Sequence, residues 1–227
     1  MLARREKLTY QIGFSLFSGM VSFLPSAGAL PVVDENFSHV GVDPNNSSQM
    51  NTSGTTMNIN GTKQNNVIGW RDFSVGKGET VQFDGGSHTK NYLNMVTGNV
   101  SSAIYGTIQG GKDVYIINPH GVLFGNGASV NVGNLYASTQ NVNPATVINA
   151  ANAANTAGTD VAASAVLGTY TNPTKSGVST LTADDGKSYT NTSVSHLADV
   201  VSLIDDSGSV VADKVVVVGG HVRFMNS

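Results

Sequence analysis

The sequence predicts an all-β protein folded as a β-solenoid, in which short strands form the sides of stacked coils. In residues 91–139, short β-branched or aromatic runs alternate with Gly, Asn and Pro. The runs span residues 104–108, 114–117, 122–124, 130–132 and 135–137. Each run is too short for a helix and has the composition that packs on a pleated sheet. Strands this short bury an apolar face only if successive coils stack on one another.

A degenerate repeat is the second observation that predicts coiling. Residues 106–108 and 112–122 are echoed by residues 208–210 and 214–222. The later copy is two residues shorter, and the difference lies within its second part, 214–222 against 112–122. Repetition of one strand-turn-strand unit is what a solenoid requires.

Alternation within the runs predicts which side chains fill the solenoid, because neighbouring residues of a strand point to opposite faces. Tyr115, Leu123 and Asn131 are expected to point outward. The side chains expected to point inward are Val114, Ile116, Val122, Phe124, Val130 and Val132.

Turn residues separate the runs. Residues 118–121 read Asn-Pro-His-Gly, with Pro where a turn needs a preset φ and Gly at the fourth position. We expect Asn118 to bond the backbone at a corner of the coil, Pro119 to fix φ and Gly121 to close the turn. Residues 125–127 read Gly-Asn-Gly, which tolerates positive φ.

The composition excludes several functional classes. Of the 227 residues, 26 are Gly and 12% are charged, which suits an all-β chain with tight turns better than a helical bundle. The net charge of -3 and the pI near 5.9 provide none of the clustered positive charge that nucleic acid requires. The chain has no Cys, which excludes disulfides, thiolate metal sites and Cys nucleophiles.

Residues 1–29 are typical of a Sec-type signal peptide. Arg4, Arg5 and Lys7 form a positive start, and a mostly apolar stretch follows at residues 12–24. A small-x-small pattern then predicts cleavage before Leu30. The alternative is a short membrane anchor. It is disfavoured because the apolar stretch is shorter than the roughly 18 to 20 residues of a spanning helix.

The rest of the chain is expected to form one domain. Residues 30–66 predict a cap or first coil, which would cover the exposed end of the solenoid. Residues 67–140 predict the core coils, and residues 197–227 a later coil. Between them, residues 141–196 predict an excursion with loops, a short helix or an extra hairpin, and residues 150–157 have helical tendency. The chain stops without a polar cap, so we expect either the front portion of a longer protein or a truncated product.

Alternation at residues 73–75 and 81–83, on either side of Gly-Lys-Gly, predicts two strands around a tight turn. Trp70, the single tryptophan, is expected to pack in the core or at the end of a coil rather than to form a ligand platform.

Motifs for catalysis and metal binding are scarce. The histidines have no i,i+4 pair and no Cys partner, so no metal and no cofactor are expected. The histidines are His39, His88, His120, His196 and His221. The sequence contains neither a Gly-x-Ser-x-Gly elbow nor the complete phosphate-binding pattern Gly-x-x-x-x-Gly-Lys-Ser/Thr.

The best case for catalysis rests on two carboxylate pairs, Asp184 with Asp185 and Asp205 with Asp206. Two acids on one surface could cleave a polysaccharide, and β-helical enzymes of this kind exist. Each pair, however, is followed by Gly or Ser-Gly, which is ordinary turn chemistry. We therefore expect no enzyme. The alternatives are a β-helical carbohydrate-active enzyme and a stand-alone surface-binding module.

Several segments together resemble a known family. Residues 67–83, 94–98, 102–108 and 114–139 are similar, in order and spacing, to the N-terminal secretion domain of filamentous-haemagglutinin-type exoproteins of two-partner secretion systems. Residues 208–224 are similar to a later coil of that domain. The resemblance implies a right-handed parallel β-helix with an N-terminal cap and small extra-helical β elements.

The resemblance also implies a function without catalysis. A domain of this kind is exported by the Sec machinery and recognised in the periplasm by POTRA domains of a cognate outer-membrane β-barrel transporter. The protein then reaches the cell surface or the medium of a Gram-negative bacterium. Full-length members are adhesins, haemagglutinins, haemolysins or toxins, some of which bind a host-cell receptor.

The family motif Asn-Pro-Asn-Gly-Ile falls on Asn118, Pro119, His120, Gly121 and Val122. Here His120 replaces the second Asn and Val122 replaces Ile, and a second family motif, Asn-Pro-Asn-Leu, has no counterpart. The residues leave two roles open, which can coexist: a structural corner and a direct contact with the transporter.

Overall fold

The computed structural model describes residues 30–125 and 127–167, together with seven later strands between residues 179 and 224. The signal segment expected at residues 1–29 lies outside the described residues, as does His221. The carboxylate pairs considered for catalysis also lie outside them: Asp184, Asp185, Asp205 and Asp206. Within the described part, neither helix is long and apolar enough to cross a membrane.

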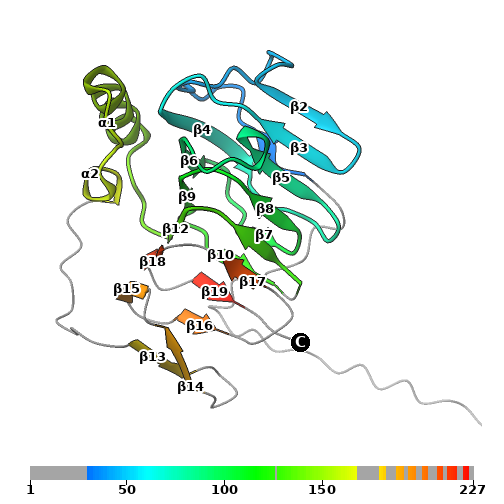
Figure 1. Ribbon diagram of the computed structural model, residues 1–227, viewed down its shortest axis with the longest axis vertical. Helices are drawn as coiled ribbons and strands as arrows, with labels where there is room; N and C mark the ends of the chain where they lie inside the picture. Colours follow the sequence, from blue (N-terminus) through cyan, green and yellow to red (C-terminus); the bar gives the residue numbers. More distant parts are fainter. Residues whose placement is uncertain are drawn as a thin grey trace, which may run out of the picture.

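Three mainly parallel sheets form the faces of the solenoid (Figure 1). Face A holds, in spatial order, β1 (Val32–Val33), β4 (Asn65–Asp72), β6 (Asn91–Val96), β9 (Asp113–Ile117), β12 (Asn134–Ser138), β18 (Lys214–Val218) and β15 (Val194–Leu197). Face B holds β17 (Ser209–Val211), β11 (Ser129–Asn131), β8 (Thr107–Gln109), β5 (Thr80–Phe83), β3 (Thr56–Ile59) and β2 (Met50–Ser53). Face C holds β16 (Val201–Leu203), β19 (Val222–Phe224), β10 (Val122–Phe124) and β7 (Ser102–Ile104).

The chain passes around the solenoid from face B to face A to face C. We call β3 and β4 coil 1, β5 to β7 coil 2, β8 to β10 coil 3, and β11 with β12 coil 4. Equivalent strands of neighbouring coils pair in parallel, as β12 does on β9 and β10 on β7. The predicted parallel β-helix is therefore confirmed.

One expected strand is wrong. Residues 104–108 do not form a single run, because β7 ends at Ile104 and β8 begins at Thr107. The chain turns a corner between them, where the N–H groups of Tyr105 and Gly106 both donate to the carbonyl of Val75 at 2.7 and 3.0 Å. A Cβ on Gly106 would lie 2.3 Å from a backbone oxygen, so only glycine permits this close approach.

The expected strand at residues 73–75 is also wrong, because β4 ends at Asp72 and Val75 makes only an isolated bridge to Ile104. The strand expected at residues 81–83 is present as β5. Strands β4 and β5 belong to different faces, so the turn between them leads around the coil rather than into a hairpin.

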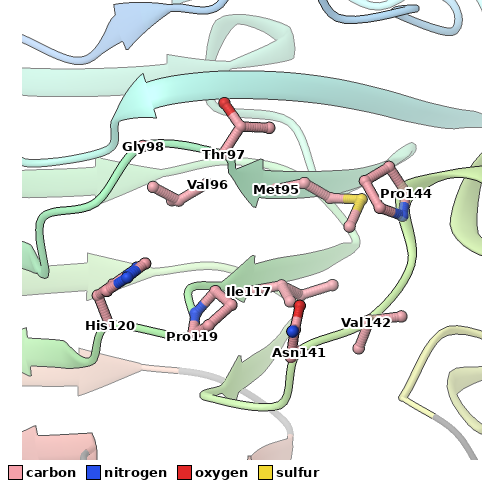
Figure 2. Close-up of a pocket in the computed structure, with 10 residues that line it drawn as sticks. All are labelled: Met95, Val96, Thr97, Gly98, Ile117, Pro119, His120, Asn141, Val142 and Pro144. Carbon is pink, nitrogen blue, oxygen red and sulfur yellow. The ribbon is translucent and has the colours of Figure 1, made fainter.

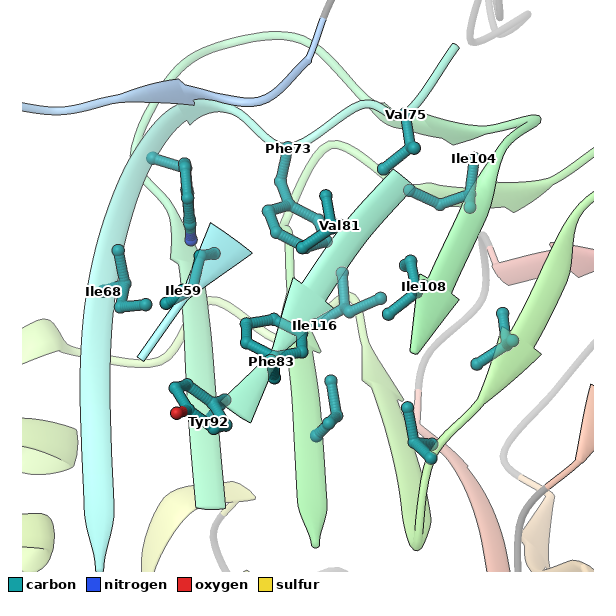
Figure 3. Close-up of a cluster of buried hydrophobic side chains, with 14 of the residues drawn as sticks. Ile59, Ile68, Phe73, Val75, Val81, Phe83, Tyr92, Ile104, Ile108 and Ile116 are labelled. Atoms are coloured by element: carbon teal, nitrogen blue, oxygen red, sulfur yellow. The ribbon is translucent and has the colours of Figure 1, made fainter. Parts of the chain in front are cut away.

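The interior of the solenoid is a continuous apolar core (Figure 3). All six side chains predicted to point inward belong to this core. Trp70 is fully buried there, as expected, and its indole N–H donates to Asn94 Oδ1 at 3.0 Å. Of the three residues predicted to point outward, Asn131 is exposed but Tyr115 and Leu123 are buried. A second layer of structure covers Tyr115 on the outside of face A.

The degenerate repeat occupies equivalent places in the solenoid. On face B, β8 and β17 both pair with β11, and on face A, β9 and β18 both pair with β12. On face C, β10 pairs directly with β19. The reason is that the chain leaves the coil after β12, so coil 4 adds no strand to face C within the described residues.

Antiparallel strands cap the N-terminal end. Strand β1 pairs antiparallel with β4, and β2 forms an antiparallel hairpin with β3. The last parallel strands at this end therefore do not present a long open edge. This end of the solenoid is therefore covered by antiparallel strands.

Two helices occupy the start of the expected excursion. Helix α1 (Pro144–Ala157) is longer than the tendency at residues 150–157 predicts, and α2 (Ala163–Leu167) follows it. The Asn143 side chain accepts the N–H of Ala145 at 2.9 Å, with Pro at the first helical position, which explains the early start. Farther along, β13 (Ser179–Thr182) and β14 (Ser188–Asn191) form an antiparallel hairpin, while β15 pairs in parallel with β18.

A half-buried histidine joins the cap to face A. His39 Nδ1 accepts the N–H of Gly69 at 3.3 Å, and its Nε2 lies 3.1 Å from the carbonyl oxygen of Asp34, to which it donates. The bond from Gly69 requires the neutral ring, because a protonated Nδ1 cannot accept a hydrogen bond. Burial lowers the pKa of His39, although the carbonyl of Asp34 and the carboxylates of Asp34 and Asp43 oppose this effect.

We predict that the hydrogen bonds of His39 make the stability of the cap dependent on pH. A lowered folded-state pKa means that the stabilisation is complete above the ordinary histidine pKa of about 6.5 and is lost as the pH falls from there through the folded-state pKa. The free energy of unfolding is measured with urea at about pH 7.5 and about pH 5. The difference between the two values should be smaller for His39→Gln than for the natural chain. The exposed His88→Gln is the control. An undiminished pH dependence in His39→Gln would contradict the assignment.

Candidate functional site

The predicted corner joins β9 on face A to β10 on face C. Asn118 is fully buried, Pro119 is partly exposed and His120 is exposed. Gly121 has φ of 115°, which disfavours any side chain, and its N–H closes the turn by donating to the Asn118 carbonyl at 3.0 Å. Val122 points into the solenoid core. Asn118, Gly121 and Val122 therefore hold the corner, while Pro119 and His120 face the surface.

Asn118 connects three consecutive coils. Its Nδ2 donates to the Val100 carbonyl at 2.9 Å and to Ser102 Oγ at 3.0 Å, both in coil 2. Its Oδ1 accepts the N–H of His120 at 2.9 Å within the turn. Its backbone N–H donates to the Ser138 carbonyl at 2.9 Å in coil 4. No smaller side chain could make all the contacts of this amide, so Asn118 is suited to hold the corner in place.

A pocket of about 390 Å³ opens beside the corner (Figure 2). Figure 2 shows Pro119 and His120 at one end and Val142 and Pro144 at the other. The complete lining is Met95, Val96, Thr97, Gly98, Ile117, Pro119, His120, Asn141, Val142 and Pro144. His120 is the one ionisable side chain among these, so the pocket suits an apolar or uncharged group.

Polar side chains occupy the first position of four face A strands and form a polar column, which the sequence did not lead us to predict. It consists of Asn65, Asn91, Asp113 and Asn134, one from each of coils 1 to 4. Asn91 Nδ2 donates to Asn65 Oδ1 at 2.8 Å, and Asn134 Nδ2 donates to Asp113 Oδ1. The residues are 26, 22 and 21 positions apart, and this recurrence at the coil period is the signal that could have revealed them.

The segment that carries both helices docks on this column. We call residues 141–167 the strap. Asn65 Nδ2 donates to the carbonyl of Thr159 at 2.8 Å, and Asn65 Oδ1 accepts the N–H of Val161 at 2.8 Å. Asn155 closes the pairing, because its Oδ1 accepts the N–H of Asn65 at 2.9 Å and its Nδ2 donates to the Asn65 carbonyl at 2.9 Å. These mutual bonds fix the end of α1 to coil 1.

Asp160 extends the docking to further coils. One carboxylate oxygen accepts from Gln64 at 2.7 Å and from Asn91 at 3.1 Å, and the other pairs with Lys112. The hydrogen bond from Lys112 lowers the pKa of the Asp160 carboxyl, opposed by burial. The paired side chains are 42% and 37% exposed, so solvent screens this ion pair. The buried Asn65 pairing therefore contributes more to docking.

Side chains that could bind a metal do not come together in the described part of the chain. Across residues 30–125 and 127–167, no three His, Asp or Glu side chains converge as metal ligands would. His39 belongs to the cap and His120 to the corner, on different parts of the solenoid.

Comparison with known families identifies the domain. A family model described as the TPS secretion domain matches residues 39–227. The chain belongs to this family. Membership confirms the resemblance noted in the sequence, and it implies an exported protein of a Gram-negative bacterium with a cognate outer-membrane transporter.

Relatives of this TPS domain are much longer proteins. Two heme/hemopexin-binding proteins of Haemophilus influenzae are 32% and 31% identical to the chain over 95 and 91 residues, or 42% and 40% of its length. Each match covers 10% of the relative, so the chain spans about a tenth of the length of these curated relatives. The crystal structure of the HMW1 secretion domain from Haemophilus influenzae is 27% identical, with a TM-score of 0.40 over 44% of this chain and 27% of that chain.

We predict that Asn118→Ala destabilises the TPS domain by about 1–3 kcal/mol, because its buried hydrogen-bond partners lose their amide. Asn141→Ala is the matched control, since Asn141 is exposed and lines the same pocket. Urea unfolding measures both. Equal stability of the Asn118→Ala variant and the control would show that the corner does not depend on this amide.

Proposed function

We propose that this domain is the part of a larger exported protein that the POTRA domains of its outer-membrane transporter recognise in the periplasm. The proposed domain comprises residues 30–227, after a Sec signal at residues 1–29 is removed. Its parts would be a cap to residue 66, core coils to residue 140, the excursion to residue 196 and a later coil. The protein would then reach the cell surface or the medium.

The observation that carries the proposal is the division of roles at the corner. The side chain of Asn118 is buried and bonded to a neighbouring coil. The positive φ of Gly121 disfavours any other residue there. Pro119 and His120 remain at the surface beside an uncharged pocket. A partner that contacts Pro119 and His120 would therefore respond both to their side chains and to correct stacking of the coils beneath them.

Strand addition would supply further affinity. Strand β2 lies at the edge of face B, and its sequence Met-Asn-Thr-Ser contains none of the charges or prolines that usually protect an edge. An extended segment of a POTRA domain could add to this edge through main-chain hydrogen bonds. Side-chain contacts at the corner would then select the cognate partner.

The activity of the full-length protein is a separate proposal. We infer an adhesin-like exoprotein that uses this domain for export and carries its receptor-binding function elsewhere. The names of the curated relatives describe heme and hemopexin binding by proteins about ten times longer than the matched segment. Heme and hemopexin binding are not part of this proposal, because the matched segment makes up only a tenth of each of those relatives.

Secretion tests the corner directly. Asn118→Ala and Gly121→Val should each lower the extracellular yield, because both disturb the corner, whereas the Asn141→Ala control should be secreted normally. The yield is measured in cells that express the cognate transporter. Unchanged yields for both corner variants would contradict the role of the corner in recognition.

Binding separates direct contact from corner structure. We expect His120→Ala to weaken binding of the purified chain to the POTRA domains by roughly tenfold, equivalent to about 1.4 kcal/mol, without a shift in its urea midpoint. Binding is measured in buffer and in mild urea. If His120→Ala binds as the natural chain does, the corner is structural only. If the natural chain binds under neither condition, the secretion role fails, and glycan binding becomes the first alternative to test.

A further inference from the structure

The outside of face A is apolar, which is unusual for a solenoid face that would otherwise meet water. Its outward side chains align from coil to coil, because Val67 pairs with Leu93, Leu93 with Tyr115, and Tyr115 with Tyr136. We call the following residues the outer patch: Val67, Leu93, Met95, Tyr115, Ile117 and Tyr136. All six are buried, and the rings of Tyr115 and Tyr136 stack at 4.2 Å.

The strap is what covers this patch. Val147 and Ala151 of α1 pack on it, as do Val161, Val166 and Leu167 farther along. Figure 1 shows α1 and α2 beside the face A strands, outside the solenoid. Burial of large side chains of this kind contributes about 1.5–3 kcal/mol each relative to exposure. An undocked strap would therefore expose a contiguous apolar surface, a feature that marks interaction sites.

The outer patch is continuous with the corner pocket. Met95 and Ile117 belong to both, since they line the pocket and pack in the cluster beneath the strap. Asn141, Val142 and Pro144, at the beginning of the strap, form the opposite wall of the same pocket. Movement of the strap away from face A would thus open the pocket into one apolar surface that begins at Pro119 and His120.

We propose that the outer patch is a second recognition surface for the transporter's POTRA domains, available while the strap is undocked and closed when the strap docks. This inference rests on the proposed function. The occupant is a POTRA domain because the patch adjoins the proposed contact at the corner and, like the pocket, carries no charge. Docking of the strap would replace the partner with the chain's own helices and so favour release of the folded domain.

Docking of the strap depends on the coils that precede it in the chain. The strap follows β12 in the chain. It bonds to three coils at the same time, through Asn65 of coil 1, Asn91 of coil 2 and Lys112 of coil 3. Those residues come together only when the three coils have stacked in register. The strap therefore closes on a correctly formed stack and remains open on an incomplete one.

The test uses a reversible covalent lock. Asn65 and Asn155 contact each other directly, and the chain has no Cys, so Asn65→Cys with Asn155→Cys can form a single disulfide that holds the strap closed. Binding of the purified oxidised chain to the POTRA domains should fall at least about tenfold, because the apparent affinity scales with the population of the open state. Reduction of the disulfide should restore it.

A second variant opens the strap. Asn155→Ala removes the pairing with Asn65 and should strengthen POTRA binding severalfold, with a parallel rise in fluorescence of an apolar dye. Asn152→Ala, at an exposed position of the same helix, is the matched control and should change neither. If the oxidised double-Cys chain binds as tightly as the reduced chain, the proposal fails even though the recognition role stands. Absence of binding by the natural chain, by contrast, would overturn the recognition role itself.

Discussion

Stacking of each coil on the next in one register is the constraint on which the rest of the domain depends. Parallel backbone pairing links coils 1 to 4 on face A, and the inward side chains meet in one core. A slip by one residue would exchange the inward and outward side chains of a strand. Asn118 and the polar column oppose such slips, because their amides reach the correct partners only when neighbouring coils are aligned.

The surfaces that we propose for transporter binding are consequences of this stack. The corner positions Pro119 and His120 because Asn118 is anchored in the coils on either side of it. The outer patch exists because equivalent apolar residues fall above one another on face A. A folding chain therefore acquires its corner, its patch and its strap-binding column together, as the first coils assemble.

Local pattern was sufficient to predict the parts of the fold in which strand alternation and turn chemistry agree. The strands on either side of Asn118 and the inward set of core residues both follow from residues a few positions apart. The broken run at residues 104–108 shows the limit. Its composition favours a strand, but a backbone carbonyl from coil 1 lies against Gly106 and turns the chain there.

The strap lay beyond local reasoning for a similar reason. Asn65 and Asn155 are 90 residues apart, and the sequence around either residue does not indicate that it contacts the other. Tyr115 was assigned to the correct face, yet its burial depends on helices that leave and return to the stack. The Asn-Pro start of α1 and the recurrence of Asn or Asp at the coil period were readable signals. Only the recurrence requires the coil length to be known first.

The central claim is that coils 1 to 4 open as one unit on which the strap depends. Hydrogen exchange measured across a urea series tests it most directly. The account predicts that amides of β4, β6, β9 and β12 share one opening free energy and one urea dependence, and that α1 opens at lower urea, before them. Separate opening of the coils one after another, or an α1 that stays protected after β4 has opened, would contradict it.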